Sequence, residues 1–137
     1  MRHIVRAKYN SHTEPIIKKL GILNLRDSYN LQCNKIMYKK KLDILHPYHS
    51  NLIQIKSESQ QTTTRQRFDI TMGKSLKFQQ INNLVYKVGK AWNDLPFELK
   101  SIDNITERTF AKRLKTHYLS TYSFTCSIRH CYICNKN

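Results

Sequence analysis

Three cysteines near the end of the sequence have the spacing of metal ligands. Cys126, Cys131 and Cys134 form the pattern C-x4-C-x2-C within "CSIRHCYICNKN". The two thiolates of a C-x2-C pair can hold one tetrahedral zinc ion across a tight turn, and Cys126 would supply a third ligand. His130 and His117 are the candidates for the fourth ligand. The spacing therefore predicts a zinc knuckle, and the alternative is a reduced tail without metal.

Positive charge is the second feature with chemical meaning. Lysine and arginine number 24 against 9 aspartate and glutamate residues, a net charge of +15 that is spread along the chain. Such a charge favours a polyanionic partner, and nucleic acid is the first candidate. An anionic membrane surface, the acidic face of another protein and a solvated surface without a ligand are the alternatives. The residues predicted to contact RNA or DNA are Arg108, Lys112, Arg113 and Lys115, with Lys39, Lys40, Lys41, Arg65 and Arg67.

A helix in the last third of the chain would present four of these cations. Ile105, Thr106 and Phe110 occupy the N′, N-cap and N4 positions of a hydrophobic staple. Phe110, Leu114 and Tyr118 continue as one apolar line, with the basic residues on the opposite side. The pattern predicts a basic amphipathic helix that is anchored in the core by Phe110 and Leu114.

Two helices are predicted before residue 46. The first is a short helix preceded by His12 or Thr13, with Glu14 and Pro15 in its first turn and Gly21 just past its end. The second starts at Asn24 and runs to about Leu45. Its apolar residues form two stripes, which indicates packing on two sides and a central position. The stripes are Leu25, Tyr29, Cys33 and Ile36, and Tyr38, Leu42 and Leu45, with Cys33 expected as a small core residue.

The stretch "YKVGKAWNDLPFELK", residues 86–100, contains the single tryptophan of the chain. Gly89 is predicted to reverse the chain direction, since glycine turns without steric cost. Residues 90–95 then make one helical turn that directs Trp92 inward, and Pro96 begins another short helix. A tryptophan beside leucine and proline is more often core than a base-stacking side chain. Trp92 and Pro96 are therefore predicted to be structural anchors.

The middle of the chain, residues 46–75, is polar and has no clear period. Its stretch "SESQQTTTRQR" predicts a mobile linker. A short strand or hairpin is predicted around Phe78 and over residues 84–88. The expected fold is mainly α: a small helical domain over residues 1–122 with an irregular or short β segment in its middle. The Cys-containing tail over residues 123–137 would follow it.

No catalytic constellation is evident in the sequence. A glycine-rich phosphate loop, an H-E-x-x-H motif and paired aspartates on a hairpin are all absent from it. We therefore expect no enzymatic activity and no small-molecule substrate. The first residues lack the apolar core of a secretory signal, and no run approaches the roughly eighteen apolar residues of a membrane span. The sequence predicts an intracellular protein of the nucleus or cytoplasm, without a membrane partner.

Several blocks of the sequence resemble one protein family. They are "YNSHTEPIIKKLGILNLRDSYNLQCNKIMYK", "TTTRQ", "VYKVGKAWNDLPFELKSI" and "FAKRLKTHYL", followed by the terminal C-x4-C-x2-C. In this order they resemble the C-terminal, post-thumb region of reverse transcriptases from non-LTR retrotransposons of the jockey and chicken-repeat type. The H-T-E-P and W-N-x-L-P blocks are the most specific. The resemblance begins near Arg2 and spans almost the whole chain.

The resemblance implies a helical accessory segment that touches the RNA template or the target DNA. The catalytic aspartates and the endonuclease of that family lie outside the matched region. One position departs from the family pattern, because Gly89 stands where a proline is frequent. Two alternatives stay open: a structural fragment that docks on a separate polymerase core, and a mobile-element remnant without function. The matching positions, expected as scaffold, are His12, Thr13, Glu14 and Pro15, then Thr64 and Arg65, then Trp92, Asn93, Leu95 and Pro96.

Overall fold

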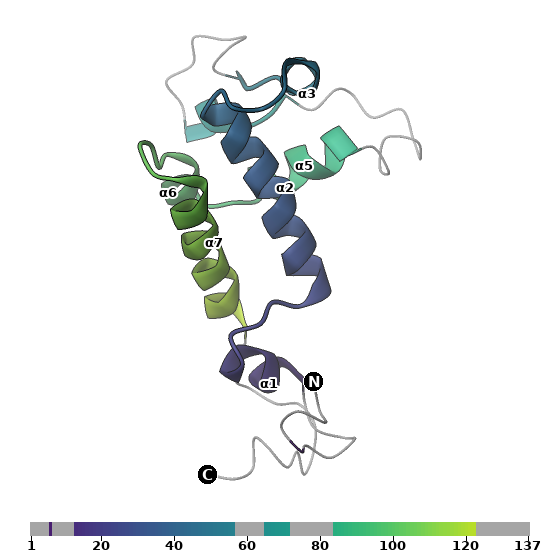
Figure 1. The fold of residues 1–137 in the computed structure, drawn as a ribbon, viewed down its shortest axis with the longest axis vertical. Coiled ribbons are helices and arrows are strands. Elements are labelled where there is room, and N and C mark those ends of the chain that lie inside the picture. The colour runs from purple at the N-terminus through teal and green to yellow at the C-terminus, as the bar shows by residue number, and fades with distance from the viewer. Residues whose placement is uncertain (1–5, 7–12, 57–64, 72–83, 123–137) are drawn as a thin grey trace. The chain divides into compact units, whose positions relative to one another are not determined.

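The computed structural model describes residue 6 and residues 13–56, 65–71 and 84–122 of the chain. In these ranges the only β structure is an isolated antiparallel bridge between Ile55 and Ile70. The predicted fold class, mainly α with an irregular middle, is confirmed, whereas the tail over residues 123–137 lies outside the described residues. The elements are α1 (Thr13–Lys19), α2 (Leu25–Lys41), α3 (Pro47–Asn51), the 3-10 helix η1 (Arg65–Phe68), α5 (Leu84–Asn93), α6 (Phe97–Lys100) and α7 (Glu107–Thr121) (Figure 1).

The chain divides into two compact units. The first consists of the residues up to Ser28 together with those from Leu114 onward, and the second is Tyr29–Arg113. Helix α2 therefore begins in the first unit and continues in the second, while α7 runs from the second into the first. Residues 1–122, expected as one helical domain, comprise parts of both units.

Stacked aromatic rings form the core of the second unit. The rings of Tyr38 on α2 and Phe110 on α7 are parallel within 7°, with centroids 4.1 Å apart, and both side chains are fully buried. The Tyr38 hydroxyl donates a hydrogen bond of 3.0 Å to the carbonyl of Ile105, just before α7 begins. Trp92 on α5 lies 6.2 Å from the Phe110 ring and is 1% exposed, the burial that the sequence predicted. Three helices are thus joined at one aromatic cluster.

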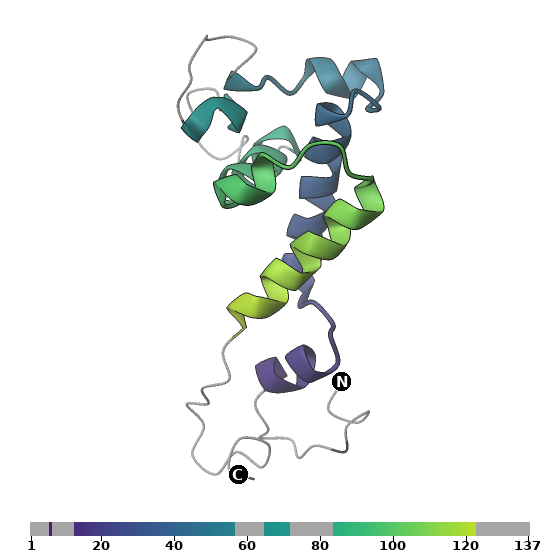
Figure 2. The same cartoon turned by 90° about the vertical axis from the view of Figure 1, so that its left-hand side faces the viewer.

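The end of α5 is fastened to the backbone that follows η1. The indole Nε1 of Trp92 donates to the carbonyl of Phe68 at 2.7 Å. The side-chain amide of Asn93 binds both polar groups of Ile70: it accepts from the N–H at 2.8 Å and donates to the carbonyl at 3.2 Å. Figure 2 shows η1 close to α5 and α6, as these bonds require. The Asn93 side chain therefore replaces the neighbouring strand that Ile70 lacks on this edge, and Trp92 fastens the backbone two residues earlier.

A buried ion pair completes this attachment. Lys100, at the end of α6, is 6% exposed and donates from Nζ to the carboxylate of Asp69 at 2.8 Å. The same ammonium group donates to the carbonyl of Asn93 at 2.8 Å. Lys56 approaches the second oxygen of Asp69 at 3.9 Å. Because both charges are paired and hydrogen-bonded, their removal from water is compensated.

A tyrosine ties the described parts of the first unit together. The Tyr122 hydroxyl donates to the Asp27 carboxylate at 2.6 Å and accepts from the backbone N–H of Asn24 at 3.0 Å. Lys18 donates to the Tyr122 carbonyl at 2.9 Å. Burial, together with the hydrogen bond to Asp27, raises the pKa of Tyr122 to about 12. The residue just after α7 thus holds the segment that connects α1 to α2.

The apolar surface of α2 differs from the predicted stripes. Leu25 is 89% exposed and Tyr29 is 45% exposed, so the first stripe is wrong over its first half. The core of the second unit lies against the later turns of the helix, where the fully buried side chains include Asn34 besides apolar residues. Cys33 is buried as predicted, and burial raises the pKa of its thiol. The buried positions are Cys33, Asn34, Met37 and Tyr38.

Helix α2 also ends earlier than predicted, at Lys41 rather than Leu45. The N–H of Asp43 donates to the carbonyl of Lys40, and that of Ile44 donates to the carbonyl of Lys39. This is the Schellman pattern, and it requires a left-handed residue after the helix. Asp43 supplies it with φ of +57°. Gly21 ends α1 in the same way with φ of +60°, as its position in the sequence predicted.

Gly89 does not reverse the chain, which corrects the sequence prediction. It is buried in the middle of α5, and residues 84–88 form helix rather than a strand. Val88, Ala91 and Trp92 are buried and lie at helical spacing, and burying this face outweighs the cost of about 1 kcal/mol for a helical glycine. Pro96 adopts an extended conformation (φ −62°, ψ 150°) as the N-cap of α6, one residue before the helix begins.

The predicted linker over residues 46–75 contains structure in its described parts. Helix α3 follows His46, whose side chain accepts a hydrogen bond from the N–H of Tyr48. Ile53 and Ile70 are buried. The polar composition of this segment did not show that short elements on both sides of residues 57–64 pack into the second unit. Residues 57–64 and Phe78 lie outside the described residues.

Replacement of Lys100 by methionine is expected to lower the free energy of unfolding by about 3 kcal/mol, because Asp69 would stay buried without its main partner. Denaturant unfolding followed by circular dichroism measures this loss. Lys90→Met, at an exposed position on the neighbouring helix α5, is the control and should change stability by less than about 0.5 kcal/mol. In the double variant Lys100→Met, Asp69→Asn the loss should be smaller than the sum of the single losses. Strictly additive losses would contradict the ion pair.

The left-handed conformation of Asp43 gives a second expectation. Asp43→Gly and Asp43→Ala remove the same carboxylate, so the difference between the two variants isolates the backbone. We expect the glycine variant to be more stable than the alanine variant by about 1 kcal/mol, since alanine pays the steric cost of positive φ. Thermal unfolding of both variants measures the difference. Equal stabilities would show that residue 43 is not held at positive φ.

Candidate nucleic-acid interface

Helix α7 carries the largest group of predicted nucleic-acid contacts. Its N-cap is Thr106, whose hydroxyl oxygen accepts from the N–H of Thr109 at 3.3 Å, as the staple pattern predicted. Phe110 and Leu114 are fully buried, so the helix has one apolar side and one solvent-facing side. The four cations all lie on exposed positions: Arg108, Lys112, Arg113 and Lys115. We call these four residues the α7 basic face.

The acidic residue of α7 is already engaged by lysines of α2. Glu107 pairs with Lys35 at 3.0 Å and with Lys39 at 3.5 Å. The hydrogen bond from Lys35 and the positive charge of both lysines hold the pKa of Glu107 below its usual value, although partial burial opposes this. No other acidic residue occurs within α7. Within α7 itself, the four cations of the basic face therefore outnumber a single carboxylate that is already paired.

The three consecutive lysines of α2 have different surroundings. Lys41 donates to the carbonyls of Lys100 at 2.7 Å and Ile102 at 3.0 Å and pairs with Asp103 at 2.7 Å. Its side chain is only 15% exposed, so it caps the end of α6 instead of facing a ligand. Lys39 pairs with Glu107, and Lys40 is half-buried. Of these three predicted contacts, Lys41 is thus engaged within the fold, whereas Lys39 and Lys40 keep partly exposed side chains.

The two predicted arginines of the middle segment belong to η1. Arg65 begins this element. Arg67 is exposed, and its guanidinium carbon lies 4.5 Å from the centroid of the Phe68 ring. Phe97 of α6 lies beside the same ring, with centroids 5.8 Å apart, and is 37% exposed. Sequence reasoning identified Arg67 by its charge but missed both phenylalanines, because nothing in the spacing shows that residues 68 and 97 meet.

The cysteines predicted to bind zinc lie outside the described residues, as does His130. His117, the other candidate ligand, is half-buried on α7 beside Tyr118, with ring centroids 5.8 Å apart. Within the described ranges, no group of three or more histidine, cysteine or acidic side chains is placed to hold a metal ion. The zinc knuckle stays a prediction.

No family model, curated protein or solved structure matches the chain. None of the helices that the structure describes is long and apolar enough to cross a membrane.

Glu107 gives a pH-dependent expectation. Its pKa is lowered in the folded state, so its contribution to stability is present above the ordinary glutamate pKa and is lost as pH falls through the lowered value. Glu107→Gln should therefore be less stable than the parent chain at pH 7. The difference should be smaller near pH 3, because it declines once pH falls below the ordinary glutamate pKa of about 4.3 and vanishes only below the lowered pKa of the folded state. Urea unfolding at both pH values measures this. If Glu107→Gln were destabilised by the same amount at pH 3 as at pH 7, the ionised Glu107 carboxylate would not be the source of this stability.

Proposed function

We propose that this chain is a non-catalytic nucleic-acid-binding module that holds the phosphate backbone of RNA or DNA. The supporting observation is the α7 basic face, in which four exposed cations share one helix whose single acid is paired with Lys35 and Lys39. Contacts to phosphates are largely independent of base sequence, so binding would be broad in specificity. Release of counterions would make it strongly dependent on salt.

The resemblance to the post-thumb region of non-LTR reverse transcriptases supports the same proposal. In this interpretation the W-N-x-L-P block is scaffold, and its side chains have the contacts that a scaffold needs. Trp92 and Asn93 bind backbone groups of Phe68 and Ile70, and Leu95 is buried. Catalysis would belong to a separate polymerase core, and this module would supply affinity for the template or target.

An apolar hollow favours a second candidate function, docking on another protein. It has a volume of about 370 Å³ and is lined mainly by aliphatic side chains of α2, α5 and the residues around α3, together with Tyr48 and His49. Leu52 and Leu84, both more than half exposed, border it. An apolar side chain of a polymerase core would fit such a surface. Capture of a protein partner that survives nuclease treatment would support docking, whereas capture that nuclease abolishes would support nucleic-acid binding.

The α7 basic face predicts how affinity responds to salt. The variant Arg108→Gln, Lys112→Gln, Arg113→Gln should bind a mixed-sequence 20-nucleotide single-stranded RNA less tightly than the parent chain. The slope of log affinity against log salt should decrease by about 2, because each lost phosphate contact removes about 0.7 from a single-strand slope. Fluorescence anisotropy titrations at salt concentrations from about 50 to about 300 mM measure both the affinity and the slope.

A matched control distinguishes the effect of the α7 basic face on binding from the effect of the overall net charge. Lys19→Gln, Arg26→Gln, Lys90→Gln removes three exposed cations from other helices, so the net charge changes equally. This control should keep most of the affinity and of the salt slope. Equal losses in both triple variants would show that net charge, and not the α7 basic face, determines binding. If the parent chain binds neither RNA nor a DNA duplex at low salt, the proposed function is wrong.

A further inference from the structure

We infer that Arg67, Phe68 and Phe97 form a stacking platform for the bases of single-stranded nucleic acid. This inference rests on the proposed function and adds the recognition of bases to the binding of phosphates. The three residues come from η1 and the first turn of α6, about thirty positions apart in the sequence. They bring a planar guanidinium group and two aromatic rings to one place.

The platform has the geometry that stacking requires. The Arg67 guanidinium lies over the Phe68 ring at 4.5 Å, and the Phe97 ring adjoins Phe68 at 5.8 Å with a tilt of 37°. Arg67 is exposed and Phe97 is 37% exposed, so part of each planar group is accessible to solvent. Unpaired bases stack on aromatic rings and on arginine planes, and every base has a face suited to this.

The platform is held in place before any ligand arrives. The carbonyl of Phe68 accepts the Trp92 indole at 2.7 Å, and the next residue, Asp69, is paired with Lys100 at 2.8 Å. Lys41, whose three donors are all engaged, lies 4.9 Å from the centroid of the Phe68 ring. A ring fixed by its neighbours loses little conformational entropy when a base stacks beside it.

Local charge indicates that this site would recognise bases rather than phosphates. Arg67 and Lys56 are positive, but Glu98 is exposed directly after Phe97, and Asp103 lies near Lys41. Asp69 is neutralised by Lys100. The platform therefore has only a small excess of positive charge, in contrast to the α7 basic face. Its contribution to affinity should come from stacking and should depend weakly on salt.

An oligomer without bases tests the inference. Two fluorescent single strands of twelve units would be compared, oligo-dT and an abasic strand with the same number of phosphates. The parent chain should bind oligo-dT at least about fivefold more tightly than the abasic strand, as one stacked base provides. Phe97→Leu keeps an apolar side chain and Arg67→Lys keeps the charge. Both variants should lose most of that preference while keeping their affinity for the abasic strand.

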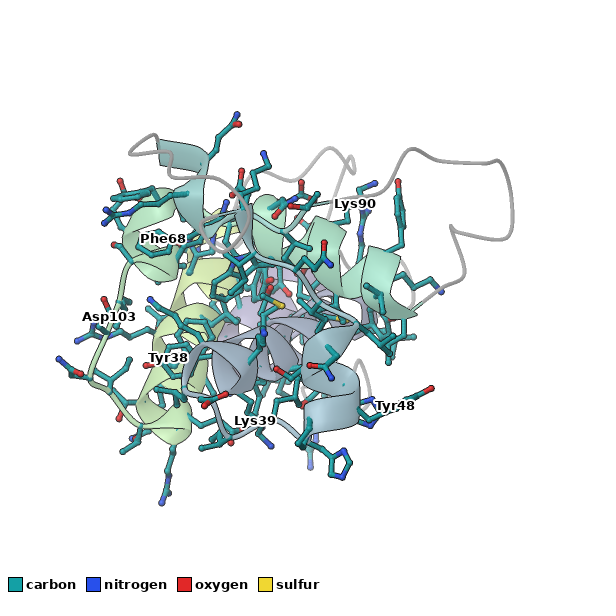
Figure 3. All side chains as sticks on the ribbon, turned by 90° about the horizontal axis from the view of Figure 1, so that it is seen from above. Tyr38, Lys39, Tyr48, Phe68, Lys90 and Asp103 are labelled. Carbon is teal, nitrogen blue, oxygen red and sulfur yellow. The ribbon has the colours of Figure 1, made fainter. Side chains whose placement is uncertain are left out.

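The matched control is Tyr48→Leu. Tyr48 is 67% exposed on α3, and Figure 3 shows it on the side of the molecule opposite to Phe68 and Asp103. This variant should retain the preference for oligo-dT. An equal loss in the Tyr48 variant, or a preference that survives in the Phe97 and Arg67 variants, overturns the platform. Equal binding of both strands by the parent chain overturns it while the proposed function stands, and binding of neither strand at low salt overturns both.

Thermal unfolding accompanies each measurement. Phe97→Leu should unfold close to the parent temperature, because the side chain is more than one-third exposed. Arg67 is exposed and forms no part of the core, so Arg67→Lys gives the same test even if Phe97→Leu proves unstable.

Discussion

The structure depends on side chains that take the place of a missing β-strand. Ile70 forms an antiparallel bridge with Ile55, and the neighbouring hydrogen bonds run from Lys56 to Asp69 and from Thr71 to Gln54. In that pairing the N–H and carbonyl of Ile70 point away from the bridge, and Asn93 binds both. The amide side chain of Asn93 thus provides hydrogen-bond partners for both backbone groups of Ile70, which would otherwise lie unpaired at the edge of the bridge. Trp92 and Lys100 secure the two residues before it.

The attachment to α5 and α6 explains why residues 65–71, whose apolar residues show no clear helical or strand period, adopt one defined position. Residues 65–71 contribute few apolar side chains, with Ile70 the one fully buried among them. Their position comes instead from hydrogen bonds to α5 and α6. Each such bond contributes only about 1 kcal/mol, but a buried partner left without its bond would cost more. The bonds therefore specify one arrangement, and the orientation of Phe68 and Arg67 follows from it.

The sequence predicted the parts of the fold that follow from local pattern. The N-cap Thr106, the glycine after α1 and the burial of Trp92 are encoded within a few residues and are found in the structure. Gly89 was misjudged because the preference of a single glycine for turns is weaker than the apolar repeat around it. The exposed Leu25 shows the limit of periodicity, since a helical stripe does not reveal how far its packing partner extends.

The candidate site was harder to predict, because charge in a sequence does not distinguish cations that bind a ligand from cations that hold the fold. A lysine has three donors, and Lys41 uses all of them on two carbonyls and a carboxylate. Lys100 uses its ammonium group on Asp69 and a carbonyl.

Both lysines therefore act as structural donors at the ends of α5 and α6, where helix carbonyls lack partners. With only 9 acids against 24 basic residues, such internal pairs consume few cations. The remaining positive charge must stay on the surface, where the polyanionic partner that we propose would relieve its mutual repulsion.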